Sequence, residues 1–203
     1  MVTGTGNIFC NGLLPEVVTP EQIREKYGRV RGVEAIAQLT KPTVAALNGD
    51  ACGIGLEIAL ACDIRVTTKT ARFSLPQVSN NVIPFGGATQ RLPRIVGQST
   101  ALEMILTGRI IDADHALRIG LVSDTVPIDE FAPRVDEIVS GLLGKGPVAL
   151  RLAKEAVNKA MDLTVDQGMR MEEDLYALLQ TTQDRAEGIE AFLARRKPRF
   201  SGR

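Results

Sequence analysis

The stretch Lys41–Glu57, with the sequence KPTVAALNGDACGIGLE, is the most informative part of the sequence. Its apolar run Val44–Leu47 is typical of a buried strand, and the turn signal Asn48-Gly49 follows it. The segment 53–63 is strongly apolar and is expected to be a helix. A strand that passes through a glycine-containing turn into a helix predicts one unit of an α/β protein.

The end of this stretch has the properties of a site for enolate chemistry. The first N–H groups of the expected helix have no partner within the helix and lie at the positive end of its dipole, where they can hold a developing negative charge. Gly53 and Gly55 allow a ligand to approach the backbone closely, and Glu57 follows within one turn. Donors beside a carboxylate suit a reaction in which the donors stabilise an oxyanion while the carboxylate moves a proton. The alternative is that the glycines only permit tight packing and that Glu57 only favours the helix N-terminus.

The pattern of strands and helices divides the chain near residue 127. In residues 1–127 short strands alternate with helices, which indicates an α/β core. From residue 128 the pattern is helical, and segment 149–157 repeats apolar residues at the spacing of one buried helix face. The expected strands are 2–3, 43–47, 64–67, 71–74 and 121–122, and a loop is expected over 76–84. The expected helices are 20–38 capped by Thr19, 53–63, one that begins at Gly86-Gly87, one from Asp112 to Gly120, 128–143, 147–161, 165–181 and 184–194.

The composition of the 203 residues excludes several classes of function. Apolar residues make up 44% of the chain, enough for the core of one domain, alone or with a small appendage. Lys plus Arg and Asp plus Glu both number 24, so the net charge is zero and the chain lacks the basic field that nucleic acid attracts. No apolar run approaches the about 20 residues that span a membrane, and Met1–Gly6 does not resemble a secretory signal. We therefore expect a cytoplasmic protein whose partners are neither nucleic acid nor membrane.

The few cysteine and histidine residues narrow the chemistry further. Cys10, Cys52 and Cys62 have no metal-binding spacing and are expected to be reduced thiols. His115 is the single histidine of the sequence, which excludes a histidine-rich metal site. Ser99 lies in an incomplete nucleophile motif and is expected to cap a helix, and the glycines at 53 and 55 lack the third glycine of a dinucleotide motif. Acid–base chemistry is therefore expected to fall to carboxylates, without a metal.

Four segments, in order, resemble the crotonase superfamily of enoyl-CoA hydratases and isomerases. They are Asn7–Leu13 (NIFCNGL), Lys41–Glu57, Phe73–Leu92 (FSLPQVSNNVIPFGGATQRL) and Ala191–Pro198 (AFLARRKP). The resemblance implies an α/β fold, with a crotonase-like spiral of ββα units in residues 1–127 and a helical C-terminal trimerisation region in residues 128–203. Family members generally carry further residues before this point, so the resemblance also implies that the N-terminal part of the usual fold is absent.

The resemblance further implies a site for an acyl-CoA thioester, with coenzyme A as part of the substrate and no separate cofactor. In the family the thioester carbonyl oxygen lies between two backbone N–H groups, which fall on Leu13 and Ile54 of this sequence. The first of two carboxylates that handle water and the Cα proton falls on Glu57. Further substrate-binding positions fall on Cys10, Asn11, Gly12, Gly53, Pro84, Phe85, Gly86 and Lys197, and Lys197 is expected to meet a CoA phosphate.

The second carboxylate of the family falls on Gln77, which is the main departure from the family's pattern. An amide orients water or a carbonyl group but does not exchange a proton near neutral pH. We therefore expect Glu57 to act as acid and base and Gln77 to be a polar positioner. The expected reaction adds water to a 2-enoyl-CoA thioester. The alternatives are an isomerase that uses one carboxylate and a catalytically silent or truncated subunit, and self-association into trimers or dimers of trimers is implied in each case.

Overall fold

The computed structural model describes residues 1–12 and 32–203. They form two compact units: a sheet unit of residues 1–39 and 43–136, and a helical unit of residues 40–42 and 137–203. Of the expected helix over 20–38, residues 32–37 are helical, whereas its start and its cap Thr19 lie outside the described residues. Leu13, one of the two expected oxyanion donors, also lies outside them.

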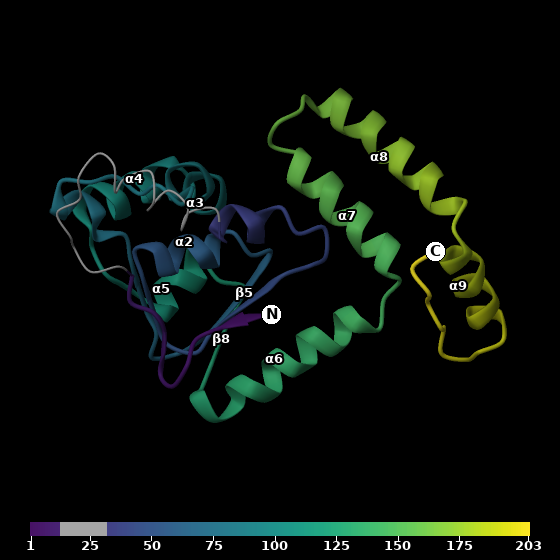
Figure 1. Ribbon diagram of the computed structural model, residues 1–203, viewed down its shortest axis with the longest axis horizontal. Helices are drawn as coiled ribbons and strands as arrows, with labels where there is room; N and C mark the ends of the chain where they lie inside the picture. Colours follow the sequence, from purple (N-terminus) through teal and green to yellow (C-terminus); the bar gives the residue numbers. More distant parts are fainter. Residues whose placement is uncertain (13–31) are drawn as a thin grey trace. The chain divides into compact units, whose positions relative to one another are not determined.

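Two four-stranded sheets run through the described part of the sheet unit (Figure 1). The first six described strands alternate between the two sheets, and a helix follows the second strand of a pair, which confirms the expected spiral of ββα units. In the first sheet, all neighbouring strands are parallel, in the order β1 (Val2–Thr3), β3 (Val44–Leu47), β5 (Ile64–Thr68) and β8 (Asp124–Val126). In the second sheet, the last strand is antiparallel to its neighbour, and the order is β2 (Ile8–Cys10), β4 (Asp50–Cys52), β6 (Arg72–Ser74) and β7 (Ile111–Asp112).

Strand β3 is part of the hydrophobic core, and its four residues are all buried. It pairs with β1 on one side and with β5 on the other. A parallel strand that is covered on both faces is typically a continuous apolar run, which the sequence VAAL provides. The largest fully buried apolar side chains of the same core are Leu47, Leu56, Phe73, Leu75, Leu92, Met104 and Leu121.

The helices of the sheet unit begin close to where the sequence predicts them. They include α2 (Ile54–Leu60), α3 (Ala88–Val96), α4 (Gln98–Thr107) and α5 (Ala113–Arg118), and the 3₁₀ helix η1 (Pro76–Asn80) occupies most of the expected loop. Asp112 caps α5 as expected, because its carboxylate accepts a hydrogen bond from the His115 N–H at 2.7 Å. This bond satisfies one of the N–H groups that a helix start leaves without a partner.

Two local predictions in this unit are wrong. The expected strand at 121–122 does not form, because both N–H groups donate back to the Ala116 carbonyl oxygen and close the end of α5. Strand β8 takes its place in the sheet. Ser99 does not cap a helix: it is the second residue of α4, and Gly97, with a φ of 83°, stands at the cap. That backbone conformation favours glycine over any other residue.

The helical unit contains the expected run of helices. Helix α6 (Ile128–Leu143) passes from the sheet unit into the helical unit, where α7 (Pro147–Lys159), α8 (Val165–Gln180) and α9 (Gln183–Leu193) follow. Helices α7 and α8 pack side by side (Figure 1). The expected buried face of α7 is only partly confirmed, because Leu152 is buried whereas Val157 is 72% exposed.

The C-terminal tail folds back onto α9 through two carboxylates. Asp184, which is buried, accepts hydrogen bonds from the N–H groups of Ser201 and Gly202 at 2.6 Å and 2.9 Å. Glu187 accepts hydrogen bonds from the Arg196 guanidinium, which lowers the pKa of Glu187 to about 2. The backbone that carries Lys197 is therefore held at both ends.

Candidate active site

Glu57 lies inside the sheet unit, within one turn of the start of α2. Its N–H donates to the Gly53 carbonyl oxygen at 3.1 Å, and its side chain is fully buried. The carboxylate atom Oε1 accepts hydrogen bonds from the N–H of Gly86 at 2.7 Å and from that of Ala88 at 3.3 Å. Ala88 is the first residue of α3, so a helix N-terminus faces this carboxylate, an arrangement that favours its ionised form.

Burial is the largest influence on the Glu57 carboxyl group and raises its pKa above the ordinary value of 4.5. The N–H groups of Ala88 and Gly86 and the charge of Arg91 lower this pKa in part. The second oxygen, Oε2, is buried and accepts no hydrogen bond from residues 1–12 or 32–203. A carboxylate with one anchored oxygen and one unengaged oxygen, and with a raised pKa, is suited to accept and return a proton.

Gln77 stands beside the start of the same helix. It belongs to η1, and a Cβ built on Gly53 would lie 3.7 Å from its Nε2 atom. Its Oε1 atom is buried and, like Glu57 Oε2, has no hydrogen-bond donor among the described residues. An acceptor left in that state costs about 1–3 kcal/mol, so both oxygens are suited to bind hydrogens of a ligand or of water.

The two glycines of the motif have different functions. A Cβ on Gly55 would lie 2.2 Å from the Cys10 carbonyl oxygen, so Gly55 permits the close packing of β2 against α2. Gly53 has a φ of 55° and lies next to Gly12 and Gln77, with 3.9 Å between its Cβ position and the Gly12 Cα atom. The expectation of tight packing therefore applies to Gly55, whereas the expectation of close ligand approach applies to Gly53, which faces the candidate site.

The other expected substrate-binding residues fall in several environments. Cys10 ends β2 and is half-buried, Asn11 is exposed, and Ile54 is the first residue of α2. Pro84 is buried, whereas Phe85, next in the chain, is 42% exposed. Lys197 is exposed and belongs to the helical unit, so its expected contact with a CoA phosphate stays a prediction.

Sequence reasoning missed part of what anchors Glu57. Gly86 was expected to bind substrate, but its N–H donates to the Glu57 carboxylate, as does the N–H of Ala88. Arg91, which donates to the Gly86 carbonyl oxygen at 2.8 Å, was not expected at all. The signal that the sequence offered was the Gly86-Gly87 pair directly before a helix, since helix N-termini bind anions.

Other candidate sites are weaker. Groups of side chains that could hold a metal ion do not occur in the described parts of the chain, and none of the helices described there is long and apolar enough to cross a membrane.

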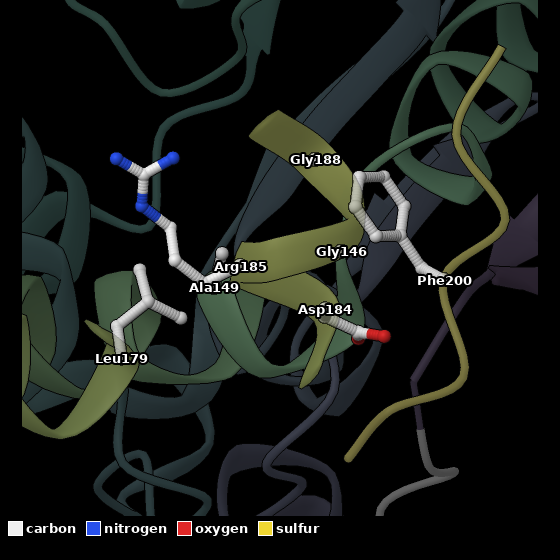
Figure 2. A pocket seen from close by; sticks show the side chains of 7 residues that line it. All are labelled: Gly146, Ala149, Leu179, Asp184, Arg185, Gly188 and Phe200. Atoms are coloured by element: carbon white, nitrogen blue, oxygen red, sulfur yellow. The ribbon is translucent and has the colours of Figure 1, made fainter. Parts of the chain in front are cut away.

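A pocket in the helical unit places Phe200 and Asp184 on one side and Leu179 with the Arg185 side chain on the other (Figure 2). Asp184 already holds the C-terminal tail, and Arg185 donates to Gln180 Oε1 at 3.0 Å, so the charged groups of this pocket serve the fold.

The sequence matches one known protein family along its whole length. The family model "Enoyl-CoA hydratase/isomerase" matches residues 1–203. The chain belongs to this family. A solved structure of an enoyl-CoA hydratase from Bacillus anthracis superimposes with a TM-score of 0.94 at 39% sequence identity, covering 99% of this chain and 80% of the other. This match also confirms the crotonase-like fold.

Two of the similar proteins are named hydratases of CoA thioesters. The crotonyl-CoA hydratase of Syntrophomonas wolfei is 43% identical over 165 residues, and the 2,3-dehydroadipyl-CoA hydratase of Escherichia coli is 43% identical over 163 residues. The matches cover 81% and 80% of this chain, but 64% of each relative. The chain thus spans somewhat less than two thirds of the length of these relatives.

Proposed function

We propose that this chain acts on an acyl-CoA thioester and adds water to the double bond of a 2-enoyl-CoA substrate. The observation that carries the proposal is the buried Glu57 carboxyl group, with Oε1 anchored by two N–H groups and Oε2 unengaged by the described residues. Family membership and the names of the relatives support the same class of substrate.

The thioester carbonyl would lie at the start of α2. Ile54 is the first residue of that helix, so its N–H has no acceptor within the helix. The close approach of Gly12 to Gly53 brings the residue before Leu13 next to the residue before Ile54. N–H groups from Leu13 and Ile54 would then stabilise the enolate oxygen, and donors of this kind contribute about 100–1000-fold each to the rate.

Glu57 would carry the proton through the whole reaction. Its ionised carboxylate accepts a proton from water, the hydroxide oxygen bonds to the β-carbon of the enoyl group, and the electron pair of the double bond moves to the thioester oxygen. The enolate then takes the same proton from Glu57 at the α-carbon, so one water molecule is added in all. Gln77 Oε1 would accept a hydrogen bond from the second O–H of that water and orient it, without taking the proton, since an amide does not exchange protons.

Isomerisation of a 3-enoyl-CoA thioester is the second candidate, and the presence of an amide at residue 77 favours it. Such a reaction moves one proton between two carbon atoms and needs only one carboxylate. Coenzyme A would enter as part of the substrate in both cases, with no separate cofactor, and Lys197 would bind one of its phosphates. We further propose that the chain acts in the cytoplasm as a trimer or a dimer of trimers.

The test compares two substrates and two variants. Purified protein is mixed with crotonyl-CoA, whose conjugated double bond absorbs in the ultraviolet, and separately with a 3-enoyl-CoA. Loss of absorbance in the wild type and in Glu155→Gln, an exposed control on α7, but not in Glu57→Gln, is the expected result. A gain of absorbance from the 3-enoyl substrate alone would establish the isomerase. A protein that changes neither substrate would contradict both candidates and favour the silent subunit.

A further inference from the structure

Gly86 and Gly87 lie between a carboxylate and a guanidinium group. A Cβ on Gly86 would stand 3.0 Å from Glu57 Cδ. A Cβ on Gly87 would stand 2.2 Å from the present position of Arg91 Nη1, and Gly87 has a φ of 97°, which favours glycine. The absence of both side chains therefore lets an anionic and a cationic group each contact the same short backbone segment.

Hydrogen bonds connect this segment to both groups. The Gly86 N–H donates to Glu57 Oε1 at 2.7 Å, and the Gly86 carbonyl oxygen accepts from Arg91 Nη1 at 2.8 Å. The Arg91 N–H also donates to the Gly87 carbonyl oxygen at 2.9 Å. Both polar groups of Gly86 are therefore engaged, one by the Glu57 carboxylate and the other by the Arg91 side chain.

We propose that Arg91 is a positioning residue for Glu57, acting through the Gly86-Gly87 segment and through its positive charge. Its effect on the Glu57 carboxyl group is independent of the proposed function. Its effect on catalysis rests on the proposed function. Arg91 is half-buried, so water screens its charge less than that of a fully exposed arginine.

Other ionisable groups on the elements around α2 do not share this arrangement. The described elements that pack against α2 include β2, β4 and α3. Cys10 lies on β2, and Cys52 on β4 accepts from the Ser74 hydroxyl at 3.2 Å. Asp50 on β4 is paired with Arg72 at 3.0 Å. Arg94 on α3 donates to the Gln90 carbonyl oxygen at 2.8 Å, which leaves Arg91 as the charge that lowers the pKa of Glu57.

The experiment titrates Glu57 directly. The carboxyl stretching band of Glu57 is identified by infrared difference spectroscopy against Glu57→Gln and is followed from acid to neutral pH. Loss of a nearby cation disfavours the carboxylate, so Arg91→Gln is expected to raise the midpoint of the Glu57 titration. Arg91→Lys keeps the charge and is expected to raise it less. Arg94→Gln, one turn along the same helix, is the control and is expected to leave it unchanged.

Kinetics then separate positioning from mere support of the fold. With crotonyl-CoA, the acidic limb of the kcat profile is expected to move with the infrared midpoint in Arg91→Gln while KM changes little. Equal midpoints in the wild type, Arg91→Gln and Arg91→Lys would overturn the inference. If Arg91→Gln does not fold, an Arg91→Lys variant with the wild-type midpoint and the wild-type kcat would also overturn it. A shifted midpoint in a protein that hydrates no crotonyl-CoA would contradict the proposed function and leave the role of Arg91 standing.

Discussion

The sheet unit and the helical unit bury their apolar residues to different degrees. Five of the seven residues of α2 are buried, Glu57 among them, whereas α8 has sixteen residues and buries none of them. On α9, Phe192 is 82% exposed. The sheet unit therefore supplies its own core and with it the desolvated setting of Glu57. The helical unit presents apolar side chains, which would suit the self-association proposed above.

The largest effect on stability is expected in the sheet unit. Leu56→Ala removes a fully buried side chain next to Glu57 in the chain and leaves a cavity in the core, which should lower the free energy of unfolding by about 2–5 kcal/mol. Val165→Ala, in α8, removes a side chain that is 82% exposed and should cost less than about 0.5 kcal/mol in dilute protein. Denaturant unfolding of both variants measures the contrast. Equal losses would show that the two units do not differ in this way.

The largest effect on activity after that of Glu57 itself is expected from Gly86→Ala. The new Cβ would press on Glu57 Cδ and shift the N–H that donates to Oε1, so we expect kcat to fall about 100-fold, the loss typical of one essential hydrogen bond in a site. Gly168→Ala on α8 is the control, because a Cβ there meets nothing within 4 Å. Steady-state kinetics with crotonyl-CoA measure the change in kcat. A Gly86→Ala enzyme with wild-type kcat would show that catalysis does not need the hydrogen bond from the Gly86 N–H to Glu57.

The pH dependence of stability tests the desolvation of Glu57. A carboxyl group whose pKa is raised by folding stabilises the protein when it is protonated, and this contribution is lost as the pH rises through the folded pKa. Glu57→Gln removes the buried charge, so the variant should gain stability over the wild type on going from about pH 4 to pH 7. Thermal unfolding across this range measures the difference. A difference that does not change with pH would contradict the raised pKa.

The smallest effect on folding but the clearest on assembly is expected in α9. Phe192→Ser should change the unfolding free energy by less than about 0.5 kcal/mol, because the side chain is exposed. If the helical unit mediates self-association, the same change should shift the protein toward monomers in sedimentation measurements. Arg195→Ser, also exposed, is a neighbouring control of different chemistry. An unchanged distribution of species in Phe192→Ser would place the interface elsewhere.

The elements best predicted from sequence are those set by local signals. Helix α6 was expected at 128–143 and is found there, because its apolar spacing ends at Gly144 and Pro147 starts the next helix. Strands β2 and β4 were not expected. Each has only three residues, and their pairing depends on long-range contacts that no local pattern encodes.

In the candidate site, too, local signals predicted part of the arrangement and long-range contacts supply the rest. The motif around Gly53 predicted a carboxylate beside a helix start, and the structure has that arrangement. The anchors of Glu57 come from Gly86 and Ala88, which follow it by 29 and 31 residues and reach it only through the packing of α3 on α2. Spacing within one segment does not reveal such a contact.

In the proposed hydration, Glu57 alone carries the proton while Gln77 only orients the water. The most direct measurement is the rate of crotonyl-CoA hydration in Glu57→Gln and in Gln77→Ala, each beside the wild type. We expect a loss of at least about 100-fold in kcat for Glu57→Gln, and a smaller loss for Gln77→Ala with the pH profile unchanged. A Glu57→Gln enzyme that hydrates crotonyl-CoA at the wild-type rate would contradict the role of Glu57 as the proton carrier.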